Sequence, residues 1–120
     1  MKRSELIAEI KRRLPPTIDV MGVPFTVKFS WNMGKADRKT YAWTVVEDRE
    51  ITVAARKIKS MEHFRSTLIH ELLHAALGTS GVTYGITDAQ EEQVIVCLEA
   101  FIAHQMDFKR FDLEHGEGYD

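Results

Sequence analysis

The chain has 120 residues, 44% of them hydrophobic and 28% charged, with a formal net charge of −2. This length is enough for one hydrophobic core and too short for two, and the composition is typical of a soluble globular protein. The nearly neutral charge gives no overall electrostatic reason to expect a nucleic-acid or membrane partner. The sequence also has neither a transmembrane run nor a signal peptide, so we expect a cytoplasmic protein.

A first helix is predicted from a cap at Ser4 to about Leu14, where Pro15-Pro16 end it. Its apolar residues recur at helical spacing and are predicted to face the core: Leu6, Ile7, Ile10 and Leu14. The basic residues that crowd this end of the chain are interpreted as a solvated helix face: Lys2, Arg3, Lys11, Arg12 and Arg13.

Apolar and polar residues alternate over much of residues 17–54, as they do in strands. The first part, residues 17–31, contains a predicted turn at residues 21–24. After a polar loop, residues 40–46 and 50–54 are predicted to pair as a hairpin. Together with the helices on either side, this pattern predicts an α+β fold with a small, mainly antiparallel sheet of three strands.

A long helix follows, predicted to begin at a Ser60 cap and to end in the stretch Gly78-Thr79-Ser80-Gly81. It contains the sequence His70-Glu71-Leu72-Leu73-His74. Two histidines four residues apart project from one helix face, close enough to bind a single metal ion, while the opposite face is apolar. Glu71 is then placed to act on a water bound to that metal. This HExxH pattern is typical of zinc peptidases.

The last helix is predicted from Thr87 or Asp88 to about Phe108, and residues 112–120 are predicted to be a disordered acidic tail. A single domain is therefore expected over residues 1–111. The buried face of the last helix is predicted from its apolar positions: Val94, Ile95, Leu98, Phe101 and Ile102.

Catalytic zinc usually has three protein ligands, and the last helix offers Glu91, Glu92 and Glu99 as the third. Glu91 projects within the apolar face, where a carboxylate is costly unless it is paired or bound to metal. Glu91 is therefore the favoured ligand, with Glu92 as the alternative. A first-turn glutamate stabilised by the helix dipole would explain Glu91 without a metal.

The remaining histidines are predicted to lie on the surface or to be partly packed rather than to bind metal: His63, His104 and His115. The single cysteine, Cys97, excludes an intrachain disulfide and fits a reducing compartment. It is predicted to be a small core residue.

The stretches Thr67–Leu77 and Gln90–Leu98 resemble the small HExxH metallopeptidase-like proteins of phages and prophages, and more distantly the glutamate-zincins. The resemblance covers about residues 40–106 and implies a minimal zincin-like fold. It also implies zinc bound by His70, His74 and a glutamate matching Glu91, with Glu71 as base. These 120 residues show no counterpart of the extra C-terminal subdomain of large glutamate-zincins, and the third-histidine spacing of metzincins is absent from them.

The expected function is therefore that of a zinc-dependent metallopeptidase in which Glu71 is the general base. Tyr84, between the two metal-site helices, is the candidate oxyanion donor, although a tyrosine packed over the core would also fit. The substrate is expected to be a protein or peptide that binds as an extended strand, with residues 40–46 as the candidate edge strand.

Two other functions stay open. The first is a non-enzymatic, zinc-stabilised binding module, for example a phage-encoded factor that blocks a host protein; an intact Glu71 counts against it, because a structural site needs no base. The second is a DNA-associated zincin, which the sequence disfavours because it has no basic stretch studded with aromatic residues.

Overall fold

Helix α1 (Arg3–Arg13) buries Ile7 and Ile10, which are 2% and 1% exposed. Its N-cap is Lys2, which makes no side-chain capping bond, so the predicted Ser4 cap is wrong. Leu14 is extended and ends the helix, as a residue before proline must be. The computed structural model describes residues 2–33 and 40–105, and the side chains of the last helix as far as residue 102.

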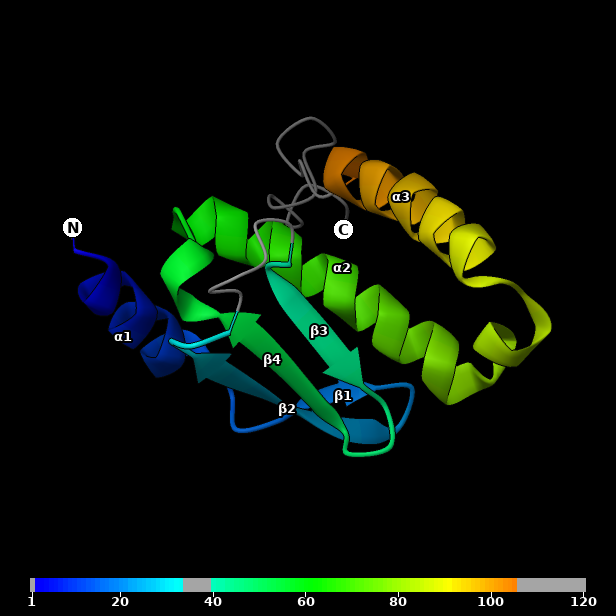
Figure 1. The fold of residues 1–120 in the computed structure, drawn as a ribbon, viewed down its shortest axis with the longest axis horizontal. Coiled ribbons are helices and arrows are strands. Elements are labelled where there is room, and N and C mark those ends of the chain that lie inside the picture. The colour runs from blue at the N-terminus through cyan, green and yellow to red at the C-terminus, as the bar shows by residue number, and fades with distance from the viewer. Residues whose placement is uncertain (1, 34–39, 106–120) are drawn as a thin grey trace, which may run out of the picture.

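A four-stranded mixed sheet follows, with the strand order β1-β2-β4-β3 (Figure 1). Its strands are β1 (Ile18–Val20), β2 (Val23–Ser30), β3 (Ala42–Val45) and β4 (Glu50–Ala54). The α+β class is confirmed. The predicted number of three strands is wrong, because the first strand region forms a hairpin of its own. Two of the three strand pairings are antiparallel, as expected, but β2 and β4 pair in parallel.

The turn between β1 and β2 explains the extra strand. Met21 and Gly22 have φ values of 52° and 86°, as in the tight two-residue turns of β-hairpins. Asp19 Oδ2 accepts a hydrogen bond from the Gly22 N–H at 3.3 Å. The turn is therefore shorter than the predicted residues 21–24, and Val23 already pairs with Val20. The predicted hairpin of β3 and β4 is present and antiparallel.

The hydrophobic core combines side chains of α1, of the sheet and of the long helix α2 (Met61–Ser80). Between β4 and α2, the short helix η1 (Ala55–Lys57) also contributes to it. The buried residues of this cluster are Ile7, Ile10, Val20, Phe25, Ile51, Val53, Ala55, Ile58, Phe64 and Ala75.

Helix α2 begins and ends as its sequence predicts, and it lies between the sheet and α3 (Figure 1). Ser60 Oγ accepts the N–H of His63 at 3.0 Å, and Gly81 adopts the left-handed conformation that ends the helix. Near this end α2 touches the segment after β3: a Cβ on Gly78 would lie 2.6 Å from Val46 Cγ2. This close approach holds the C-terminal part of α2 against the segment after β3.

Helix α3 (Asp88–Gln105) follows the short helix η2 (Val82–Gly85) and rests on α2. The prediction of a broad buried face is wrong. Ile95 is fully buried, but Val94, Leu98 and Phe101 are 40%, 37% and 62% exposed. The reason is that α3 packs beside α2 and not into the core, so only a narrow strip of α3 is covered.

Cys97 is exposed on α3, so its prediction as a core residue is wrong for the same reason. The predicted end of α3 at Phe108, the His115 side chain and the tail at 112–120 lie outside the described residues, as does the side chain of His104. Over the described part of the chain, no helix has the length and apolar character needed to cross a membrane.

Candidate metal centre

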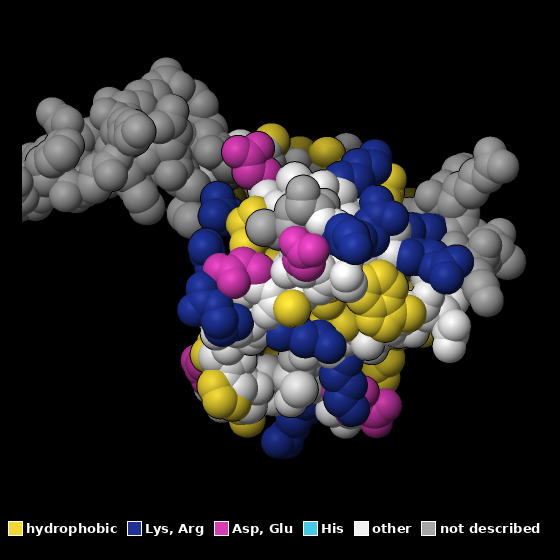
Figure 2. Space-filling view, turned by 90° about the vertical axis from the view of Figure 1, so that its left-hand side faces the viewer, with side chains coloured by type: hydrophobic (Ala, Val, Ile, Leu, Met, Phe, Trp, Pro, Cys, Tyr) yellow, Lys and Arg dark blue, Asp and Glu magenta, His cyan; other side chains and the backbone are white. Residues whose placement is uncertain are grey.

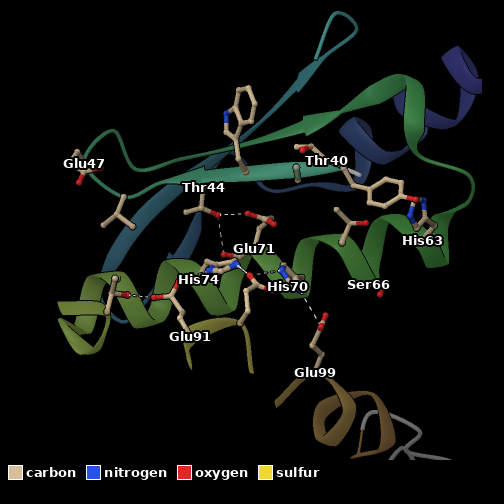
Figure 3. A pocket seen from close by; sticks show the side chains of 18 of the residues that line it. Thr40, Thr44, Glu47, His63, Ser66, His70, Glu71, His74, Glu91 and Glu99 are labelled. Atoms are coloured by element: carbon tan, nitrogen blue, oxygen red, sulfur yellow. Dashed lines mark hydrogen bonds and ion pairs between the residues drawn. The ribbon is translucent and has the colours of Figure 1, made fainter. Parts of the chain in front are cut away.

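His70 and His74 lie one turn apart on α2, with their ring centroids 5.0 Å apart. The side chains are 28% and 22% exposed, so both rings are half-buried but reachable. They come together because positions i and i+4 share one face of a helix. Figure 3 shows both rings at the cavity, close to carboxylates of α3. The pairing predicted from the HExxH sequence is therefore present.

Glu71 is 6% exposed and is the one buried charged side chain within the described residues. Its Oε1 accepts a hydrogen bond from the hydroxyl of Thr44, on β3, at 2.8 Å. The same hydroxyl lies 3.2 Å from the backbone oxygen of Glu71 (Figure 3). A buried carboxylate is costly unless it is paired, and Thr44 compensates part of that cost.

A metal ion could be held by His70, Glu71 and His74. One ligand atom from each of these residues can be chosen so that all three lie within 4.8 Å of one another. Imidazole nitrogens and carboxylate oxygens are a donor set that suits zinc and other divalent transition metals. The residues present thus fit a metal ion.

Helix α3 brings a further carboxylate to the two histidines. Glu92 Oε1 lies 2.7 Å from His74 Nε2 and 3.5 Å from His70 Nε2. Both imidazoles therefore direct the same ring nitrogen, Nε2, to one carboxylate oxygen. This is the arrangement that a shared ion between the two rings would need.

The Nδ1 atoms face two other carboxylates. Glu91 Oε2 lies 2.6 Å from His74 Nδ1, and Glu99 Oε1 lies 3.1 Å from His70 Nδ1. A carboxylate on the second ring nitrogen is common for histidines that bind metal, because it fixes the tautomer and the orientation of the ring. Each ring here has a carboxylate on both sides.

Glu91 is itself held in place by a second bond. The hydroxyl of Thr83, on η2, donates to Glu91 Oε1 at 2.6 Å. The hydrogen bond from Thr83, followed by the bond and charge of His74, lowers the pKa of Glu91 although burial opposes this shift. Both oxygens of Glu91 thus have partners, which holds the carboxylate ionised against His74 Nδ1.

The carboxylates on both sides of each histidine favour a positive charge at this place. A neutral imidazole has one N–H and can donate to only one of two flanking carboxylates. Its other nitrogen then presents a lone pair to a carboxylate oxygen, which is repulsive unless a proton or a metal ion lies between them. A second proton or a metal ion can supply that charge, and the convergence of two Nε2 atoms fits a metal ion.

All three candidate glutamates of α3 thus lie beside the two histidines, but they face different ring nitrogens. Glu91, the favoured ligand, meets the Nδ1 side of His74, whereas Glu92, the alternative, lies between the two Nε2 atoms. The sequence reasoning missed Thr44 and Thr83. Neither has a sequence signal, because Thr44 reaches the site through the packing of β3 on α2 and Thr83 through the turn that joins α2 to α3.

The centre lies in a cavity of about 900 Å³ between β3, α2, η2 and α3. Tyr84, the predicted oxyanion donor, lines this cavity but is 86% exposed. Tyr41 and Trp43 of the β3 region also line it, and they give one wall an aromatic character.

His63 lies at another part of this cavity and is partly packed, as predicted. Its Nδ1 accepts the N–H of Lys59 at 3.0 Å, and its ring meets Tyr41 edge-on. Burial, followed by the nearby charge of Lys59, lowers the pKa of His63. His63 therefore favours its neutral form and acts as a structural acceptor.

Comparisons of the chain with protein-family models, with curated proteins and with solved structures find no match. The function must therefore be argued from the residues of the site.

Proposed function

We propose that this protein is a zinc-dependent peptidase in which His70, His74 and Glu92 hold the metal and Glu71 is the general base. The observation that carries the proposal is the convergence of both Nε2 atoms on Glu92 Oε1, beside a buried glutamate. A structural site needs no such glutamate, whereas a hydrolytic site does.

The choice of Glu92 departs from the sequence-based preference for Glu91. Glu91 already has a hydrogen-bond partner on each oxygen, Thr83 and His74 Nδ1. In this position it would orient His74 and raise the basicity of the ring as a ligand. Glu99 would do the same for His70.

Zinc bound here would supply a Lewis acid for a peptide carbonyl and a water acidic enough to lose a proton near neutral pH. Glu71 would take that proton and pass it to the leaving amine. Thr44 would fix the direction of the Glu71 carboxylate through Oε1. Burial of Glu71 would strengthen these interactions, because the local dielectric constant is low.

An extended peptide is the substrate class that the surroundings favour. In the described sheet β3 is the last strand and pairs only with β4, so its outer edge could add a peptide strand above the histidines. Tyr41 and Trp43 would then contact apolar side chains of the peptide. Tyr84 is exposed and could donate to the oxyanion only after closing onto a substrate.

The test compares wild type with Glu71→Gln, and with Glu62→Gln as a control on an exposed glutamate of the same helix. Each form, loaded with zinc, is incubated with a cell extract, and newly formed peptide termini are identified by mass spectrometry. We expect the same cleavage products from wild type and from Glu62→Gln, and none from Glu71→Gln with its zinc content unchanged.

Products that persist in Glu71→Gln would remove this residue as the base. If none of the zinc-loaded forms gives any product, the alternative of a zinc-stabilised binding module gains support. In that case the three carboxylates of α3 would close the site against water.

A further inference from the structure

Although the net charge is only −2, basic and acidic residues are concentrated in different parts of the chain. Residues 2–13 and 55–65 contain nine lysines and arginines against three glutamates, a net charge of +6 in 23 residues. Most of these basic side chains are exposed. The rest of the chain is correspondingly acidic, including the glutamates around the metal centre. We call the surface formed by residues 2–13 and 55–65 the basic face.

The two segments of the basic face lie together in space. Arg3 Nε donates to the backbone oxygen of Ile58 at 3.0 Å, which ties α1 to the segment after η1. Figure 1 shows α1 and the beginning of α2 at the same end of the molecule. Figure 2 looks onto that end and shows many Lys and Arg side chains with few acidic ones among them.

Several of these cations are not neutralised by neighbours. Glu9 pairs with Arg12 and Arg13, which reduces their contribution. Lys2, Arg56, Lys59 and Arg65 are all exposed, and none of them makes an ion pair with an acid in the described part of the chain. Such a group of cations attracts a polyanion, and its effect is local and does not depend on the net charge.

Aromatic side chains border the basic face. Phe29, near the end of β2, stacks on Phe64 of α2 at 5.8 Å, and Lys11 of α1 lies 5.6 Å above its ring. The end of β2 is thus enclosed by both segments. Trp31 is the first residue after β2 and is 42% exposed. The residue before it, Ser30, pairs with Ala54, which directly precedes η1. An exposed indole beside a cationic surface can serve as a stacking platform for a base.

We propose that the basic face binds single-stranded nucleic acid, with phosphates on Lys2, Arg56, Lys59 and Arg65 and an unpaired base on Trp31. An indole can stack on an unpaired base but not on one already stacked in a duplex, which favours the single strand. The acidic metal centre lies further along α2 and on α3, and its carboxylates would repel the phosphates. The binding is therefore separate from the proposed hydrolysis and does not depend on zinc.

The first test is fluorescence anisotropy with labelled 20-mers of dT and of U at several salt concentrations. Arg56→Glu and Lys59→Glu are compared with Arg49→Asp, which changes the charge equally in the turn before β4. Asp tolerates the positive φ of residue 49. Each variant of the basic face should weaken binding at least about threefold, and the slope of log K against log salt should fall by about 0.7 per lost phosphate contact. Arg49→Asp should change affinity less than about twofold.

The second test concerns stacking and uses a background of Trp43→Phe, which leaves Trp31 as the single tryptophan. Its fluorescence should be quenched when the oligonucleotide binds. Trp31→Ala should weaken binding about fivefold or more with the salt slope unchanged, and Trp31→Phe should restore most of the affinity. Preference for dT or for U would tell whether the strand is DNA or RNA.

Three results would overturn the inference. The first is no binding of either oligonucleotide at low salt, with the fold of each variant verified by circular dichroism. The second is a loss of affinity in Arg49→Asp equal to that in the variants of the basic face, which would show that binding depends on the total charge and not on this face. The third is tighter binding to duplex DNA, or to vesicles containing phosphatidylserine, than to the single strand.

Discussion

The hydroxyl of Thr44 lies 2.8 Å from Oε1 of Glu71 and joins the last strand of the described sheet to the one buried charged side chain in that part of the chain. The strand that could bind a peptide and the carboxylate that could take a proton are therefore held at a fixed position relative to each other. A shift of β3 along α2 would change both together. This contact links the fold to the proposed chemistry.

Removing this hydroxyl should destabilise the protein. Thr44→Val keeps the shape of the side chain but leaves the buried carboxylate of Glu71 without its donor, at a cost of about 1–3 kcal/mol in the free energy of unfolding. Thr44→Ser should retain most of that free energy, since it retains the hydroxyl. Urea unfolding of the two variants measures the difference. Equal stability of Thr44→Val and wild type would show that the contact contributes nothing.

Alanine substitutions of the three glutamates of α3 should lower the zinc affinity of the protein to different extents. Glu92→Ala removes a proposed ligand, whereas Glu91→Ala and Glu99→Ala remove carboxylates behind the rings, which typically costs about 10-fold to 100-fold. We therefore expect Glu92→Ala to raise the Kd for zinc more than either of the others, measured by competition with a chromogenic chelator. If Glu91→Ala has the largest effect, the sequence-based choice of ligand is correct and ours is wrong.

The rank of these glutamates also illustrates what sequence can and cannot predict. The sequence specifies the caps of α2 at Ser60 and Gly81 and the pairing of His70 with His74, because caps and helical spacing are local. Periodicity along α3 indicates which side is apolar, but not how much of that side another element covers. The exposure of Phe101 and the approach of Glu92 to the histidines both depend on how α3 crosses α2.

The sheet was harder to predict for a related reason. A hairpin such as β3 and β4 follows from neighbouring residues, whereas the parallel pairing of β2 with β4 joins segments separated by a whole strand. Alternation along β2 is the same whichever partner it has. Thr44 comes to lie over Glu71 only through the packing of β3 on α2, so no spacing in the sequence could reveal their contact.

Acidification should destabilise the protein through His63. Burial, together with the charge of Lys59, lowers its pKa from the ordinary value of 6.5, so the unfolded chain binds a proton more readily than the folded one. The free energy of unfolding should therefore fall as the pH drops below about 6.5. The variant His63→Asn cannot titrate and retains an acceptor for the Lys59 N–H.

The comparison uses urea unfolding of wild type and His63→Asn at pH 7.5 and at pH 5.5, both without metal. We expect the loss of stability at the lower pH to be smaller in the variant. An identical loss in both proteins would mean that His63 does not contribute to the pH dependence.

Removing the metal should loosen α3 before the rest of the fold. Ile95 is the only fully buried apolar side chain of this helix in its described part, so the contacts of its carboxylates with the histidines carry much of its attachment. A bound ion stabilises the folded state by RT ln(1 + [L]/Kd), about 4 kcal/mol at a thousandfold excess over Kd. A chelator should therefore lower Tm and speed amide hydrogen exchange in α3 more than in β4. Unchanged exchange in α3 would show that it docks without metal.

The central claim is that the two imidazoles of α2 bind zinc together with a carboxylate of α3. X-ray absorption spectroscopy of the zinc-loaded protein tests it most directly, because it reports the atoms bound to the metal. We predict one zinc ion per chain, with scattering from two imidazole rings and oxygen in the remaining positions, and loss of that signal in His74→Ala. A spectrum without imidazole scattering, or one unchanged in His74→Ala, would contradict the account.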